Sequence, residues 1–299
     1  MTASGAKPFR FGVNMLLPDS RDAWVAKCRR VEELGYDVLS VADHLGMAPP
    51  FPALVLAGEA TSRVRLNTFV LNVGFHRPAL LAREVTGTDR FVGGRLELGL
   101  GAGYVQAEFE AAGLEFPSPG RRVDHLEHTI KELKRLYADP GHQPAPVNPG
   151  GPPLLIGGNG DRMLTLAAEH ADIVAFTGTT KPPADGVFVP ATPDEVEERV
   201  RFVTAKLGDR AGQVEFNLLV HFVDVRDDRQ RALEELHERI PGAPGVAELA
   251  GSPTVLIGTA EEIADLLVAH RERFGISYYT VLEPHLEAFA PVVELLRGR

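Results

Sequence analysis

The chain has 299 residues, of which 44% are hydrophobic and 24% are charged, and its formal net charge is −10. This length and composition suit one soluble globular domain, and the acidic balance argues against nucleic acid or an anionic membrane as the main partner. The single cysteine excludes a disulfide framework and any multi-cysteine metal site. No apolar stretch approaches the roughly 18–20 residues of a membrane span, and residues 1–10 lack an apolar signal core, so we expect a cytoplasmic protein.

Strand-like and helix-like segments alternate along the chain. Several of the strand-like runs are short and apolar throughout, which is typical of strands buried on both faces of a parallel sheet. We predict strands at 9–17, 38–42, 66–71, 96–100, 153–157, 172–176, 214–223 and 277–282. Eight strands alternating with helices predict an α/β fold, a (β/α)8 barrel formed by one domain over residues 8–299, with residues 1–7 disordered. A doubly wound sheet is the competing architecture, but it usually has fewer strands.

Helical periodicity appears between these strands. The first helix spans 21–34, places Cys28 on its apolar face and stops at Gly35, so we expect Cys28 in the core. A further helix begins at Thr259 with a capping box to Glu262. Two others are predicted at 121–138 and 285–297.

Two long segments carry no periodicity. The first, 139–152, lies between a helix and a strand, so we expect it at the N-terminal face of the barrel in a structural role. The second, 178–193, follows a strand and is a candidate lid over the site, because long loops in compact domains are usually functional or disordered.

Polar residues follow the second and third strands. Asp43 and His44 come directly after the second, where a carboxylate and an imidazole can hold a ligand's polar groups or move a proton. A solvated loop pair or a helix cap is the alternative, but barrel enzymes bind ligands at strand C-termini, so we favour function. Asn72, Val73 and Gly74 interrupt the third strand, as a bulge beside a ligand or as an ordinary strand end before a Pro-started helix.

The fourth strand opens into glycines. Gly99 to Gly103 do not form a dinucleotide fingerprint, because Tyr104 stands where G-x-G-x-x-G requires glycine. Glycines such as Gly101 that let a flat ring approach the backbone fit better. Glu108, a few residues on, either reaches the same pocket or is an exposed helix carboxylate.

Two glycine-containing loops follow the fifth and sixth strands. Gly157, Gly158, Asn159 and Gly160 precede a helix, and consecutive amides at a helix N-terminus bind anions. The next loop, Thr177, Gly178 and Thr179, adds hydroxyl donors. We favour a phosphate site over two ordinary turns.

A metal site is not expected. The chain has no H-E-x-x-H and no H-x-H at a strand end, and a serine-hydrolase elbow is also absent. His125 and His128 are spaced i, i+3 on a helix but follow no strand, so we expect both at the surface.

Four sequence blocks together resemble the luciferase-like family of flavin and deazaflavin oxidoreductases over nearly the whole chain. The likeness is strongest to an actinobacterial-type branch that uses the deazaflavin coenzyme F420. The blocks are residues 33–44, residues 77–103, residues 153–160 with 167–173, and residues 258–263.

The resemblance implies a luciferase-like barrel with insertions at the C-terminal face and the cofactor ring lying across the strand ends. It also implies a non-prolyl cis peptide behind the ring, at Asn72–Val73 or one bond later. His44 matches the histidine often placed beside the deazaflavin, and Glu108 falls near an acidic position of that pocket. Some relatives carry a tryptophan shortly after this histidine, whereas Gly46 and Met47 stand there in this chain.

The sequence therefore predicts an oxidoreductase that transfers hydride between F420 and a small organic substrate. His44 would handle a proton or polarise the substrate, and Asp43 would orient His44. An FMN-dependent monooxygenase is the first alternative, and a non-catalytic flavin-binding protein is the second. The loops that would contact the substrate do not identify it. We expect a homodimer.

Overall fold

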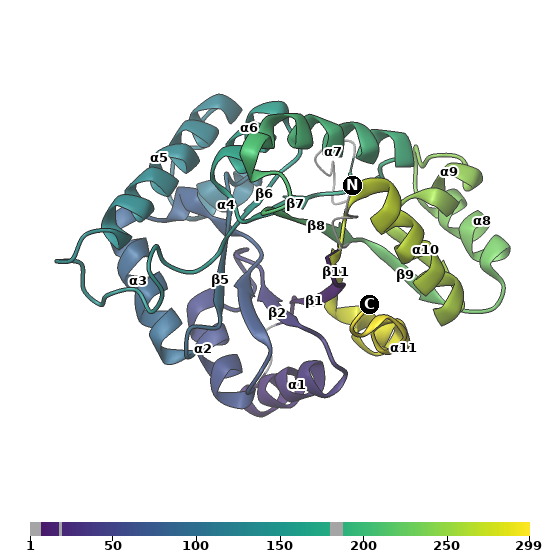
Figure 1. The fold of residues 1–299 in the computed structure, drawn as a ribbon, viewed down its shortest axis with the longest axis horizontal. Coiled ribbons are helices and arrows are strands. Elements are labelled where there is room, and N and C mark those ends of the chain that lie inside the picture. Colours follow the sequence, from purple (N-terminus) through teal and green to yellow (C-terminus); the bar gives the residue numbers. More distant parts are fainter. Residues whose placement is uncertain (1–6, 18–19, 180–187) are drawn as a thin grey trace.

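The computed structural model describes residues 7–17, 20–179 and 188–299 (Figure 1). Most of residues 1–7, for which we expected disorder, and the centre of the expected lid at 178–193 lie outside the described residues. Lys7, the first described residue, donates hydrogen bonds to the carbonyl oxygens of Gln213 and Val214.

Parallel strands form a closed barrel, which confirms the predicted (β/α)8 architecture. The sheet order is β3-β2-β1-β11-β8-β7-β6-β5-β4, and an additional parallel pairing of β3 with β5 closes the ring. β4 continues β3 after a break at Phe69 and Val70, so the two count as one barrel strand. The strands are β1 (Arg10–Met15), β2 (Val38–Val41), β3 (Arg65–Thr68), β4 (Leu71–Asn72), β5 (Leu96–Gly101), β6 (Leu154–Gly157), β7 (Ile173–Phe176), β8 (Glu215–Val220) and β11 (Tyr278–Leu282).

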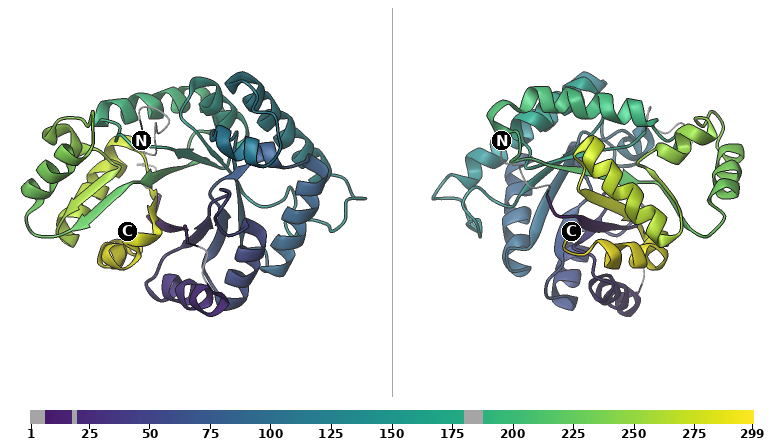
Figure 2. Two further views of the ribbon diagram at one scale, coloured as in Figure 1. Left: turned by 180° about the vertical axis from the view of Figure 1, so that it is seen from behind. Right: turned by 45° about the vertical axis from the view of Figure 1, so that its right-hand side comes forward.

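Helices surround these strands, as Figures 1 and 2 show from three directions. They are α1 (Arg21–Glu33), α2 (Pro50–Ala60), α3 (Pro78–Phe91), α4 (Gln106–Ala111), α5 (Pro119–Tyr137), α6 (Asp161–His170), α7 (Pro193–Leu207), α8 (Arg229–Arg239), α9 (Val246–Gly251), α10 (Ala260–Phe274) and α11 (Leu286–Leu296).

The helix boundaries follow the local signals in the sequence. Gly35 takes a left-handed φ of 85° just after α1, and Gly275 ends α10 in the left-handed conformation. Thr259 and Glu262 form the predicted capping box at the start of α10. Cys28 has no exposed surface, which confirms its place in the core.

A small layer after β8 was not predicted. The run 214–223 is two strands, because β8 ends at Val220 and β9 (Phe222–Val225) begins after His221. β9 pairs in parallel with β10 (Val255–Gly258). Side chains of α8, α9 and the two strands form a separate apolar cluster that includes Leu233, Leu249 and Ile257. This insertion follows the carboxyl end of β8 and lies at one end of the molecule (Figure 1).

The barrel interior carries a row of polar side chains. Asn14 on β1 pairs in register with Ser40 on β2, Ser40 with Asn67 on β3, and Asn67 with Glu97 on β5. All four residues are at most 5% exposed, and each has at least one side-chain atom without a hydrogen-bond partner among the described residues. Leaving a buried polar atom unpaired costs about 1–3 kcal/mol, so each of these atoms needs a hydrogen-bond partner.

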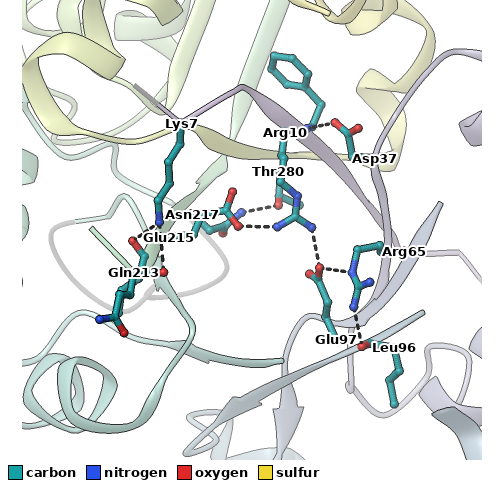
Figure 3. A network of polar contacts seen from close by, with 12 residues as sticks. Lys7, Arg10, Asp37, Arg65, Leu96, Glu97, Gln213, Glu215, Asn217 and Thr280 are labelled. Atoms are coloured by element: carbon teal, nitrogen blue, oxygen red, sulfur yellow. Dashed lines mark hydrogen bonds and ion pairs between the residues drawn. The ribbon is translucent and has the colours of Figure 1, made fainter. Parts of the chain in front are cut away.

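Charged side chains close the N-terminal mouth of the barrel (Figure 3). Arg10 donates to Glu97 Oε1 at 2.6 Å and to Glu215 Oε2 at 2.5 Å, and Arg65 Nε donates to the same Glu97 oxygen at 2.6 Å. Burial raises the pKa of Glu215, although Arg10 opposes this effect. A cavity of about 320 Å³ lies here, and its lining includes Arg10, Glu97, Glu215, Lys7 and Asp172.

Close packing inside the barrel makes Gly99 intolerant of a side chain. A Cβ atom at Gly99 would lie 1.9 Å from the Thr68 carbonyl oxygen, so the backbone of β3 or β5 must shift. We predict that Gly99→Ala lowers the free energy of unfolding by about 2 kcal/mol or more in urea denaturation. The control is Gly87→Ala within α3, where the nearest atom would be 3.8 Å away and helix propensity favours alanine by about 0.5–1 kcal/mol. Equal stability of the two variants would contradict the packing described.

Candidate active site at the carboxyl ends of the strands

His44 and Glu108 meet at the C-terminal face of the barrel. His44 follows β2, and Glu108 lies on α4, which follows β5. His44 Nδ1 and Glu108 Oε1 are 2.8 Å apart, with the two side chains 31% and 16% exposed. Gly103, with a φ of 74°, turns the intervening chain back toward β4. A carboxylate on Nδ1 selects the tautomer protonated there, which leaves Nε2 to accept or donate a proton.

The expectation that Asp43 orients His44 is not met. Asp43 Oδ2 instead accepts a hydrogen bond from the Asn72 backbone amide at 3.0 Å and lies 3.4 Å from His76 Nε2. Neighbouring side chains on an extended segment point to opposite sides, so Asp43 and His44 face different partners. Asp43 therefore ties the end of β2 to the end of β4.

The predicted segment Asn72, Val73 and Gly74 forms a capped turn. Asn72 Oδ1 accepts from the Gly74 amide at 3.0 Å, and Val73 begins a short 3-10 turn. His125 reaches the Val73 carbonyl oxygen with Nε2 at 3.1 Å. His125 is thus half-buried rather than at the surface, whereas His128 is exposed as expected. The hydrogen bonds described for residues 72–74 are all made within the protein.

The non-prolyl cis peptide lies at Phe69–Val70, so its expected position at Asn72–Val73 or the next bond is wrong. It falls between β3 and β4, where β3 stops earlier than the apolar run suggested. The Val70 side chain lies against Gly101 and Gly157: a Cβ atom on these glycines would be 2.6 Å and 3.4 Å from its methyl groups. The glycine at 101 is needed for this contact within the protein.

In the predicted anion-binding loop, residues 157–160, only some of the backbone amides are free to bind an anion. The Gly158 amide already donates to the Ala175 carbonyl oxygen at 3.1 Å, so it is not a candidate donor. α6 begins after Gly160, whose position carries no side-chain cap, and first-turn amides have no intrahelical partner. Asn159 Nδ2 donates to the Thr179 carbonyl oxygen at 3.0 Å and joins this loop to the next one.

His221 supports the loop of Thr177, Gly178 and Thr179, and sequence reasoning missed it. His221 Nε2 is 2.8 Å from the Thr177 carbonyl oxygen, and its ring stacks on Phe188 with centroids 4.6 Å apart. Burial lowers the pKa of His221, although the bond to Thr177 opposes this. The sequence did contain a signal for His221, because this residue follows β8 as His44 follows β2. It was overlooked because the predicted strand 214–223 included His221.

A cavity of about 660 Å³ adjoins His44. One wall is the loop after β2 with the start of α2, which supplies mostly apolar side chains such as Met47 and Phe51. The other includes His76 and residues of α3 such as Arg83. Tyr104 approaches the His44 ring edge-on at a centroid distance of 6.0 Å. Burial raises the pKa of Tyr104, and the nearby Glu108 adds to this effect.

Residues 7–17, 20–179 and 188–299 contain no cluster of three or more His, Cys, Asp or Glu side chains arranged to hold a metal ion. Nor do they contain a helix that is both long and apolar enough to cross a bilayer.

Asp43 is the residue whose loss should loosen this face of the barrel. Asp43→Ala leaves the buried Asn72 amide without its acceptor, and we predict a loss of about 1–3 kcal/mol in unfolding free energy by urea denaturation. The control is Asp265→Ala, at an exposed position of α10, which should change stability by no more than about 0.5 kcal/mol. A loss at Asp43 no greater than at Asp265 would show that the link between β2 and β4 contributes little.

A sequence profile of luciferase-like monooxygenases matches residues 6–278. Among relatives, the 5,10-methylenetetrahydromethanopterin reductase of Archaeoglobus fulgidus is 29% identical over 157 residues, which cover 50% of this chain and 47% of that protein. The F420-dependent glucose-6-phosphate dehydrogenase of Kribbella flavida is 32% identical over 121 residues, covering 38% and 36%. The chain thus matches less than half the length of these two. The 4-hydroxyprotoasukamycin monooxygenase of Streptomyces nodosus is 23% identical over 286 residues, covering 82% and 75%.

Solved structures share the whole fold at low identity. An F420-dependent secondary alcohol dehydrogenase, in complex with an F420–acetone adduct, superposes with a TM-score of 0.76 at 17% identity, covering 98% of this chain and 100% of that one. A long-chain alkane monooxygenase superposes with a TM-score of 0.77 at 13% identity, covering 99% and 92%. At this identity the likeness is one of fold.

Proposed function

The chain belongs to the luciferase-like monooxygenase family, and on that premise we propose that it is an oxidoreductase that uses coenzyme F420 to transfer hydride to or from a small organic substrate. The observation that carries the proposal is the His44–Glu108 pair, a proton-handling group held at the ligand-binding face of the barrel. Of the relatives described above, the Kribbella flavida dehydrogenase is F420-dependent by name, which supports the choice of cofactor.

The residues present fit a cofactor with a flat ring and a phosphate. The uncapped first turn of α6 offers backbone amides to a phosphate, and the hydroxyls of Thr177 and Thr179 lie on the adjoining loop. Arg199 lies beside this turn, where its guanidinium pairs with Asp161 at 2.5 Å and with Glu198. When bound, F420 would supply a carbon that gives or takes hydride.

The protein's own part in the reaction is to manage one proton. Glu108 holds His44 in the tautomer protonated at Nδ1, and Nε2 then takes a proton from, or returns it to, the substrate oxygen or nitrogen. Thr177 and Thr179 are kept in place by His221 and Asn159, which fixes the anchoring loop. The cavity beside His44, with its apolar wall, favours a substrate that has an apolar body and one polar reacting group.

Cofactor titration tests this proposal. We predict that the protein binds F420 at least tenfold tighter than FMN, a margin of about 1.4 kcal/mol, measured by fluorescence quenching of each cofactor. Tighter FMN binding, with oxygen consumption when reduced FMN is supplied, would favour the monooxygenase alternative, which the long match to 4-hydroxyprotoasukamycin monooxygenase supports. Tight binding without turnover of any substrate would favour a non-catalytic binding protein.

Substitutions at Gly160 test the proposed phosphate site. Gly160 is the N-cap of α6, and a Cβ atom there would meet no other atom within 4 Å. We predict that Gly160→Asp stabilises the fold by about 0.5 kcal/mol or more, because its carboxylate caps the free amides, yet weakens F420 binding at least tenfold.

Gly160→Ala is the matched control, because it adds neither a cap nor a charge. Its affinity for F420 should stay within about threefold of the wild type. Unchanged F420 affinity in the stabilised Gly160→Asp variant would place the phosphate elsewhere.

The proton-handling pair makes a separate prediction. His44→Ala should lower kcat by about 10²-fold, the usual scale for losing a general acid–base, once a substrate screen has identified a turnover assay. Glu108→Gln should also lower kcat, and F420 affinity should change much less in both. Glu110→Gln on the same helix is the control, since Glu110 is exposed and pairs with Gln106. If His44→Ala keeps the wild-type kcat, His44 does not transfer a proton and only lines the pocket.

A further inference from the structure

We propose that the barrel interior binds an ordered file of water molecules along the polar row of Asn14, Ser40, Asn67 and Glu97. The file connects the cavity at the N-terminal mouth with the underside of the candidate active site. This inference does not depend on which cofactor or substrate the protein uses.

The row crosses the barrel from one end to the other. Asn14 is the last but one residue of β1, and Glu97 is the second residue of β5. Each residue between them is the register partner of the next on the adjacent strand. Because strands are staggered in a barrel, following these partners from β1 to β5 leads from the carboxyl ends of the strands toward their amino ends.

The unpaired atoms along this row require partners. Within the described residues, Asn14 Oδ1, Ser40 Oγ, both polar atoms of the Asn67 side chain and Glu97 Oε2 make no hydrogen bond by distance and angle. Asn217 Oδ1, beside the row, also makes no hydrogen bond. The Tyr278 hydroxyl interacts with the Asn67 side chain but does not reach it with good hydrogen-bond geometry. Buried polar groups in folded proteins are paired with protein or with water almost without exception.

Water fits both the spacing and the surroundings. Adjacent strands are about 4.8 Å apart, and one water with hydrogen bonds of about 2.8 Å to each side spans that gap. Val38, Leu155 and Ile173 belong to a buried cluster whose only polar side-chain atom is the Tyr278 hydroxyl, so the protein offers the row few partners of its own. The unpaired atoms include both donors and acceptors, as a water molecule requires.

The lower end of the row has a source of water. Glu97 lines the cavity of about 320 Å³ at the N-terminal mouth, together with Arg10 and Glu215. Glu97 Oε1 is occupied by Arg10 and Arg65, while Oε2 is the unpaired oxygen. Figure 3 shows the Arg10 guanidinium between the carboxylates of Glu97 and Glu215. Asn217 Nδ2 donates to Thr280 Oγ1 at 2.9 Å, so its Oδ1 is the atom left for water.

Magnetic relaxation dispersion of water oxygen-17, which counts long-lived internal waters, tests the proposal in the whole protein. Ser40→Ala removes a hydroxyl of the row, and Asn67→Leu replaces the amide by methyl groups with the same branching. Each should lower the count by at least one water. Thr86→Val is the matched control, because Thr86 is fully buried but its hydroxyl already donates to the Ala82 carbonyl oxygen in α3. Its count should equal that of the wild type.

A crystal structure of the wild type at a resolution that shows ordered water provides the second readout. It should place waters about 2.7–3.2 Å from Ser40 Oγ and Asn67. An unchanged water count in Ser40→Ala, or a dry row in which these side chains pair with one another, would overturn the proposal. If Asn67→Leu fails to fold, Ser40→Ala and the crystal structure still decide the question.

Discussion

The pairing of β3 with β5 closes the barrel, and the rest of the structure depends on that closure. In a closed ring of parallel strands every carboxyl end lies on the same rim, so loops that are distant in sequence become neighbours. His44 and Glu108 are 64 positions apart and lie in hydrogen-bond contact. Asn159 reaches Thr179 on the next loop, and Asp43 reaches Asn72 in the same way.

The two ends of the barrel are built from different chemistry. The amino-terminal mouth is held by Arg10 and Arg65 on the buried Glu97, and Arg10 also pairs with Glu215. The carboxyl-terminal rim carries histidines and uncapped amides that are only partly buried. The first arrangement fixes the strands, and the second leaves donors and acceptors available to a ligand.

Sequence reasoning located the barrel strands and the best-capped helices, because period and capping are local properties of the chain. It missed β9 because His221 divides a run that looks continuous, and it did not predict β10, the partner of β9. It also misplaced the cis peptide and assigned the wrong partner to Asp43. These errors concern which side chains contact one another, and tertiary structure decides such contacts. His125, for example, is half-buried because its Nε2 contacts the Val73 carbonyl oxygen.

In the proposed function, the cofactor lies across the carboxyl-terminal rim with its phosphate at the first turn of α6. Hydrogen–deuterium exchange of the protein with and without F420 tests this placement, because it reports on every loop of the rim at once. We expect slower exchange at three places: the segment after Asp43, the first turn of α6, and residues 177–179. Amides around Arg10 at the opposite mouth should exchange at the same rate with and without F420. Protection confined to that mouth, or none on the rim at saturating F420, would contradict the account.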